Sequence, residues 1–106
     1  MSVKQMPIRN DIPAYTFQTE LDGDLYTFDF HFSRRSERWF FDIYDAELNL
    51  LVAGVKCLCR TPVLGRYKDD RLPPGNFIFV NQRNASEQPN RENFSITVFM
   101  LYEEAA

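Results

Sequence analysis

Few side chains in this sequence have the type and spacing that catalysis requires. His31 is the one histidine, and it follows Asp29 by two residues, so on a strand both side chains would share one face. An aspartate that orients an imidazole is one part of an activated nucleophile, but no motif marks a hydroxyl or thiol as its partner. A surface or interface histidine is the simpler interpretation, and an enzyme built on His31 and Asp29 is kept as one hypothesis.

The two cysteines, Cys57 and Cys59, are separated by one residue. A disulfide between them is disfavoured at this spacing. We expect one to pack inside and the other to face solvent or a partner. Structural zinc takes four ligands, typically from paired Cys-x-x-Cys units, so two cysteines and a distant histidine predict no metal site.

Paired carboxylates are the remaining route to chemistry. Asp29 and Asp42, or Glu20 and Asp22, could share one face of a hairpin, and two facing carboxylates can form a glycosidase pair. Solvated strand faces carry such pairs routinely, and the glycines fit neither a phosphate-binding loop nor a dinucleotide fingerprint. We therefore predict no enzyme activity and no cofactor.

Length and composition restrict the class of protein. The chain has 106 residues, enough for a single domain that spans residues 1–106. Aromatic residues make up 15% of it, and these suit half-buried strands. The net charge of −3 disfavours binding to nucleic acid or to anionic lipid. The longest apolar run, residues 50–55, is too short to span a membrane, and no signal peptide is visible.

Alternating apolar and polar residues predict strands at 14–21, 25–32, 38–45, 77–80 and 94–102. Asp22-Gly23 separates the first two of these, which predicts a tight hairpin because glycine tolerates positive φ. Residues 48–58 are apolar on both faces, as in a strand covered on both sides, and Gly54 suggests a bulge there. Residues 1–7 are expected to form an arm, with a possible seventh strand near the N-terminus, and residues 103–106 a tail.

No helix is predicted, so the fold class is all-β. About six to seven antiparallel strands close best as a small barrel or a two-sheet sandwich, which protects their edges. The core is expected to include Trp39, Phe41, Phe28, Phe30, Val52 and Val98.

Two long loops, residues 60–76 and 81–93, are expected to make most of the partner contacts. The first could bind phosphate, but Asp69 and Asp70 lie within it, and Arg and Tyr are favoured at protein interfaces. The second is polar and is expected to be mobile alone. The turn at 33–37 is the alternative docking surface. The candidate interface residues are Arg60, Arg66, Tyr67, Lys68, Arg71, Asn84, Asn90 and Arg91.

The order and spacing of short motifs resemble the phage baseplate plug family. The matching residues are Ile12-Pro13, Tyr15, Phe17, Leu21-Asp22-Gly23, Tyr26, Phe28, Trp39, Phe41-Asp42-Ile43, Leu51-Val52-Ala53-Gly54-Val55, Arg66-Tyr67, Leu72-Pro73 and Gly75-Asn76-Phe77. The segments 57–62 and 81–93 depart from the pattern.

This resemblance implies a structural protein of a contractile-tailed phage, made in the host cytoplasm and located in the tail baseplate of the virion. It implies contacts with hub and tail tube proteins in a symmetric, multi-copy ring, with no catalysis and no contact with nucleic acid or membrane. The alternative from the residues alone is a binding module for a saccharide or peptide, in which Phe40 and Tyr44 form a stacking platform beside Asp42.

Overall fold

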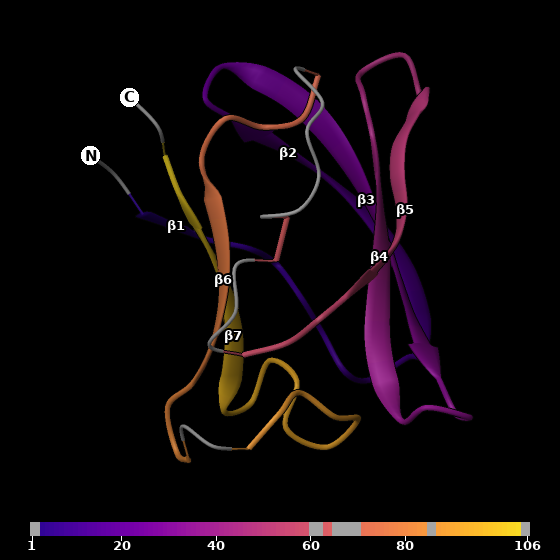
Figure 1. Ribbon diagram of the computed structural model, residues 1–106, viewed down its shortest axis with the longest axis vertical. Coiled ribbons are helices and arrows are strands. Elements are labelled where there is room, and N and C mark those ends of the chain that lie inside the picture. Colours follow the sequence, from indigo (N-terminus) through magenta and orange to yellow (C-terminus); the bar gives the residue numbers. More distant parts are fainter. Residues whose placement is uncertain (1–2, 60–62, 65–70, 85–86, 105–106) are drawn as a thin grey trace.

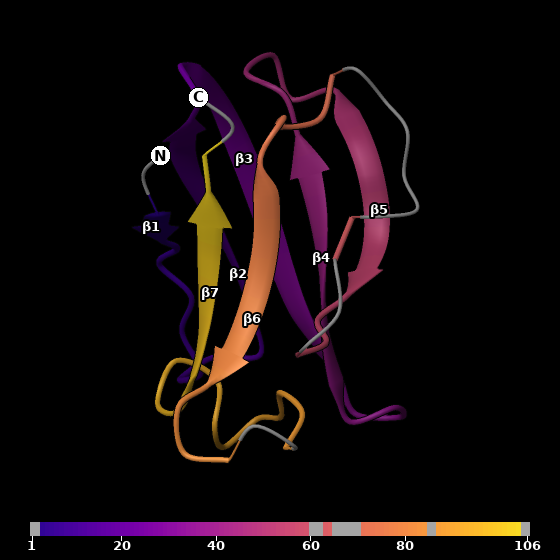
Figure 2. The ribbon, with the colours of Figure 1, turned by 60° about the vertical axis from the view of Figure 1, so that its left-hand side comes forward.

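The computed structural model describes residues 3–59, 63–64, 71–84 and 87–104. Within these residues no helix occurs, and the chain forms two antiparallel sheets that lie face to face (Figures 1 and 2). One sheet has the order β2-β3-β4-β5 and the other β1-β7-β6. The strands are β1 (Val3–Gln5), β2 (Ala14–Leu21), β3 (Asp24–Ser33), β4 (Arg38–Tyr44), β5 (Leu50–Lys56), β6 (Asn76–Asn81) and β7 (Val98–Glu103). The fold is therefore all-β, as predicted. Of the two predicted architectures, the two-sheet sandwich is confirmed and, among the described residues, the closed barrel is not found.

Aromatic rings from both sheets fill the space between them. Phe30 and Phe41 stack within the larger sheet at a centroid distance of 5.1 Å, and Phe28 meets Phe77 of β6 edge to face at 5.7 Å. Such rings bury large apolar areas, which is the main favourable term in folding. The predicted core is confirmed for Trp39, Phe41, Phe28, Phe30 and Val98, all fully buried, whereas Val52 is only partly buried.

Two local predictions about the backbone are confirmed. Asp22 and Gly23 join β2 to β3 with φ of 51° and 88°, the double positive φ of a two-residue hairpin turn. Phe41 of β4 pairs with Val55 of β5, and Ile43 pairs with Val52. A step of two residues along β4 therefore corresponds to a step of three along β5, so β5 carries an extra residue. Gly54 lies in this bulge with φ of 67°, and its N–H donates to Asp42 Oδ1 at 2.8 Å.

Two predictions about burial after β4 are wrong. β5 is the last strand of its sheet, not a strand covered on both sides, and the Leu50 side chain is 50% exposed. Cys57 and Cys59 are both buried, because the chain leaves β5 and crosses between the sheets. There the Cys57 N–H donates to the Trp39 carbonyl, and Cys59 pairs with Phe79 of β6. Burial raises the pKa of both thiols, which keeps them protonated near neutral pH.

The first and last strands also differ from the sequence prediction. The possible seventh strand near the N-terminus is confirmed as β1, which occupies part of the segment at 1–7 that was expected to form an arm. β7 begins at Val98 and not at residue 94, because the Asn93 carbonyl accepts hydrogen bonds from the N–H groups of residues 96, 97 and 98 and holds a turn there. Phe94 stays buried, but Ile96 is 62% exposed, because it lies in this turn and not in a strand.

A buried polar contact joins the sheets near the start of β6. The Tyr102 hydroxyl donates to Asp22 Oδ2 and accepts a hydrogen bond from the Gly75 N–H at 2.7 Å. A Cβ on Gly75 would lie 2.1 Å from the Glu103 carbonyl oxygen and 2.6 Å from Tyr102 Cζ. Only glycine therefore fits where the chain enters β6.

We expect Gly75→Ala to lower the free energy of unfolding by about 1–3 kcal/mol, the usual cost of overpacking, since the clashing atoms include backbone. Chemical denaturation of the purified chain measures the loss. Asn76→Ala is the control, because Asn76 is the next residue in the chain and its side chain is exposed. Equal denaturation midpoints for the two variants would contradict this account of Gly75.

Candidate protein interface

The predicted interface residues do not form one surface. Arg60, Arg66, Tyr67 and Lys68 lie outside the described residues. Arg71 precedes β6, where its carbonyl accepts a hydrogen bond from the Tyr26 hydroxyl at 3.4 Å. The others, Asn84, Asn90 and Arg91, follow β6 and lie at the opposite end of the sandwich (Figure 1).

A hollow of about 420 Å³ lies at this second end. It is formed where the β3–β4 turn meets the β6–β7 loop, and its walls are Phe32, Arg34, Glu37, Asn90, Arg91 and Glu92. The predicted residues Asn90 and Arg91 thus adjoin the turn at 33–37 that was the alternative docking surface. Two positive and two negative side chains line the hollow, which suits a polar protein surface of mixed charge.

Asparagine side chains hold the β6–β7 loop in shape. Asn90 Oδ1 accepts hydrogen bonds from the N–H groups of Glu92 and Asn93, each at 2.9 Å, and Asn93 Oδ1 accepts one from the Asn90 N–H at 2.7 Å. The Asn93 amide also donates to Glu87 Oε1 and to the Gln88 carbonyl. Such side-chain turns replace the backbone pairing that a strand would supply. Residues 87–93 are therefore joined to one another by hydrogen bonds within the chain, and the expected mobility of the loop stays a prediction.

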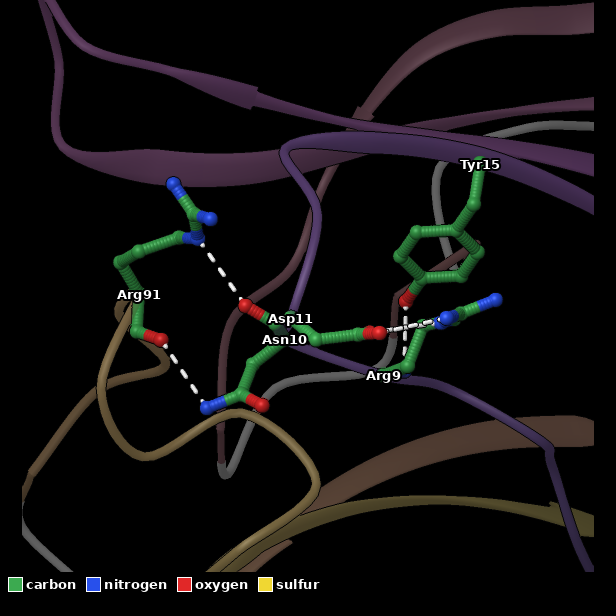
Figure 3. A network of polar contacts seen from close by, with 5 residues as sticks. All are labelled: Arg9, Asn10, Asp11, Tyr15 and Arg91. Atoms are coloured by element: carbon green, nitrogen blue, oxygen red, sulfur yellow. Dashed lines mark hydrogen bonds and ion pairs between the residues drawn. The ribbon is translucent and has the colours of Figure 1, made fainter.

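Arg91 fixes the loop to the segment between β1 and β2 (Figure 3). Its Nε donates to the Asn10 carbonyl at 3.1 Å, and the Asn10 amide donates back to the Arg91 carbonyl at 3.3 Å. The guanidinium also lies 6.0 Å from the centroid of the Phe32 ring, a cation–π distance. One wall of the hollow is therefore attached to two other parts of the chain.

The same segment carries a second polar contact, also drawn in Figure 3. Two guanidinium nitrogens of Arg9 meet both carboxylate oxygens of Asp11, and the Arg9 backbone N–H donates to the Tyr15 hydroxyl at 2.9 Å. The hydrogen bond from Arg9 lowers the pKa of Asp11, although both side chains are more than half exposed and so stabilise the fold little. Burial raises the pKa of Tyr15, which keeps its hydroxyl neutral.

His31, Asp29 and Asp42, which were considered for catalysis, lie elsewhere, on the outer face of the larger sheet. Asp22 does not share that face with Glu20, because its carboxylate accepts the hydrogen bond from the Tyr102 hydroxyl. His31 stacks on Phe40 at a centroid distance of 5.8 Å. Asp29 lies opposite Asp42 in the β3–β4 pairing and contacts Thr16 Oγ1 at 3.4 Å. Among the described residues, no group of three or more His, Cys, Asp or Glu side chains is placed to bind a metal.

The sequence did not indicate Phe32 and Glu92 as lining residues, because Phe32 has the pattern of an ordinary strand residue and Glu92 that of a solvated loop. Arg34 and Glu37 lie in the turn at 33–37, which the sequence analysis gave as the alternative docking surface. The one local signal was the spacing of Asn90 and Asn93, which is that of a side-chain turn. Contact between this turn and the 33–37 turn joins segments more than fifty residues apart, which no local pattern encodes.

The sandwich, its exposed turns and its charged hollow fit a small protein of a larger assembly. Residues 3–105 match the family described as Cyanophage baseplate Pam3 plug gp18, and the chain belongs to this family. No curated protein matches the chain. Membership gives the chain a structural role in a phage baseplate, a location in the virion tail and contacts with other baseplate proteins. No described segment is a helix long and apolar enough to cross a membrane.

We expect Asn93→Ala to lower the free energy of unfolding by about 1–3 kcal/mol, because it leaves buried hydrogen-bonding groups without partners. Amide hydrogen exchange should also become faster at residues 87–98 by a larger factor than in β3 and β4, whose exchange follows only the loss of global stability. Gln82→Ala, at an exposed position of the same loop, is the control. Unchanged exchange at 87–98 would show that the Asn90–Asn93 contacts do not hold the loop.

Proposed function

We propose that this chain is a plug at the central hub of a contractile phage tail baseplate, where it acts by protein–protein contact and without catalysis. The observation that carries the proposal is the family match over residues 3–105, almost the whole chain. Hub and tail tube proteins are the proposed partners, arranged around a symmetric, multi-copy ring. The net charge of −3 favours protein over nucleic acid as the partner.

The hollow beside the β3–β4 turn is the proposed docking end. Its lining comes from an exposed turn and from a loop that internal hydrogen bonds hold in place. A loop that is already ordered loses less conformational entropy on docking, so its contacts contribute more of their energy to affinity. Arg34 and Glu37 on the turn, together with Arg91 and Glu92 on the loop, would pair with opposite charges of the partner.

Two adjacent arginines allow a matched test of this docking end. Arg34 lines the hollow and Arg35 does not, although both side chains are exposed. We expect Arg34→Glu to reduce the amount of the chain in purified tails by about tenfold or more, since a reversed charge in a desolvated contact costs several kcal/mol. Arg35→Glu should enter particles normally, and both variants should melt like the wild type.

Quantitative mass spectrometry of purified tails measures these amounts. If the wild-type chain were absent from tails, the proposed function would be wrong. If the two variants entered particles equally well, the function could stand but the hollow would not be the docking end.

A small binding module for a saccharide or peptide is the second candidate function. One observation favours it, namely that Phe40, Asp42 and Tyr44 form a row on one outer face of β4. Such a module would be a monomer whose melting temperature rises with ligand, whereas a plug would bind hub protein and show no shift with glycans.

A further inference from the structure

We propose that the outer face of the β2-β3-β4-β5 sheet docks an extended segment of another baseplate protein, one with a Lys or Arg flanked at two-residue spacing by apolar side chains. The proposal rests on the proposed function for the identity of the partner. It concerns a surface distinct from the hollow, formed by strand side chains on the face opposite to the aromatic core.

Strand register determines which side chains share this face. Residues directly opposite each other in an antiparallel pair lie on the same side of the sheet. Asp29 pairs with Asp42, His31 with Phe40, and Tyr44 with both Thr27 of β3 and Leu50 of β5. Along β4 the outer row is therefore Phe40, Asp42 and Tyr44, and the inner row is Trp39, Phe41 and Ile43.

Apolar side chains gather at one end of this face. Leu50 is 50% exposed beside Tyr44, and Leu25 of β3 is 41% exposed two residues before Thr27. Leu48 is 61% exposed in the turn that leads from β4 to Leu50. Single exposed leucines are ordinary, but a group beside an aromatic ring on an otherwise solvated sheet face is typical of a contact surface.

The middle of the face is acidic and lacks an ion-pair partner within the described residues. Asp29 and Asp42 are direct cross-strand neighbours, an arrangement that is unfavourable for like charges. Their hydrogen bonds come from Thr16 and from the Gly54 N–H, both uncharged. The cations of the face, Arg38 and Lys56, lie toward its Phe40 end. A basic side chain from a partner would relieve the repulsion at the centre.

Spacing determines the form of the occupant. Successive outward residues of a strand lie about 6.8 Å apart. An extended segment laid along β4 presents its own side chains with the same period, so a basic residue facing Asp42 brings its i−2 and i+2 neighbours over Phe40 and Tyr44. Apolar groups at those two positions would cover the rings and the exposed leucines.

Two other occupants fit less well. A second copy related by two-fold symmetry would set its Asp29–Asp42 pair against the same pair, which like-charge repulsion disfavours. Strand addition at the β5 edge is opposed by the bulge at Gly54 and by a second register shift between Ile43 and Tyr44, because bulges blunt sheet edges.

The first test neutralises the acidic pair. We expect the double variant Asp29→Asn, Asp42→Asn to melt at the same temperature as the wild type or higher, because repulsion is removed and Asn can still accept the hydrogen bonds. Its amount in purified tails should nonetheless fall by about tenfold. Asp24→Asn, at the exposed start of β3, is the control. Normal incorporation of the double variant would overturn the proposal.

The second test identifies the occupant in assembled particles. A photoreactive phenylalanine analogue replaces Tyr44, or Ala14 of β2 as a control, which pairs with His31 at the other end of the same face. The proposal expects capture at position 44 of a segment that carries Lys or Arg two residues from apolar side chains. Capture of a second copy of this chain, of a segment without a basic residue, or of nothing would overturn it.

A titration independent of particles separates this inference from the proposed function. The probe is a synthetic peptide, Thr-Leu-Thr-Arg-Thr-Leu-Thr, added to the full chain labelled with ¹⁵N. Saturable shifts at outer-face amides of β3 and β4, with affinity about tenfold weaker for the peptide with Glu in place of Arg, support the proposal. Equal affinities, or shifts on this face with a linear oligosaccharide instead, overturn it, whether or not the chain is present in tails.

Discussion

Packing around Trp39 connects the core of this sandwich to its docking end. The indole is fully buried and stacks on Phe94 at a centroid distance of 4.7 Å, while Tyr15 and Phe32 meet it edge on. Its Nε1–H donates to the Asn90 carbonyl at 3.1 Å, so the ring also holds the loop that lines the hollow. One buried side chain therefore positions β2, β3 and the β6–β7 loop together, and the surface formed by these elements depends on the core being intact.

The two ends of the sandwich are closed by different physical means. At the Trp39 end, asparagine side chains satisfy the backbone of a loop that has few apolar residues of its own. At the other end, the Tyr102 hydroxyl joins Asp22 of one sheet to the entry of β6 in the other, and a glycine is required for the chain to pass. Both solutions satisfy buried polar groups, without which the loops could not pack so closely against the sheets.

Sequence alone was sufficient where the determining contacts are local. The Asp22-Gly23 turn, the bulge at Gly54 and the alternation along β4 depend on neighbouring residues, and each was predicted correctly. The sequence analysis failed where burial depends on how the sheets are layered. The apolar run at residues 50–55 indicated burial on both faces, yet each sheet of a two-layer sandwich has one face uncovered, and β5 exposes Leu50. The burial of both cysteines was missed because it depends on distant partners, the Trp39 carbonyl for Cys57 and Phe79 of β6 for Cys59.

β4 shows how one strand can carry both stability and assembly. Its inner residues, Trp39, Phe41 and Ile43, are fully buried and set the position of the strand within the core. Its outer residues are only partly buried, and the pairing of Asp42 with Asp29 places two like charges side by side. A face selected for stability alone would carry threonine or oppositely charged pairs at these positions. Because β3 and β4 also end in the turn that lines the hollow, one rigid hairpin fixes the angle between both proposed docking surfaces. A partner bound at one surface would then meet a second partner in a defined orientation, which is what an assembly requires of its components.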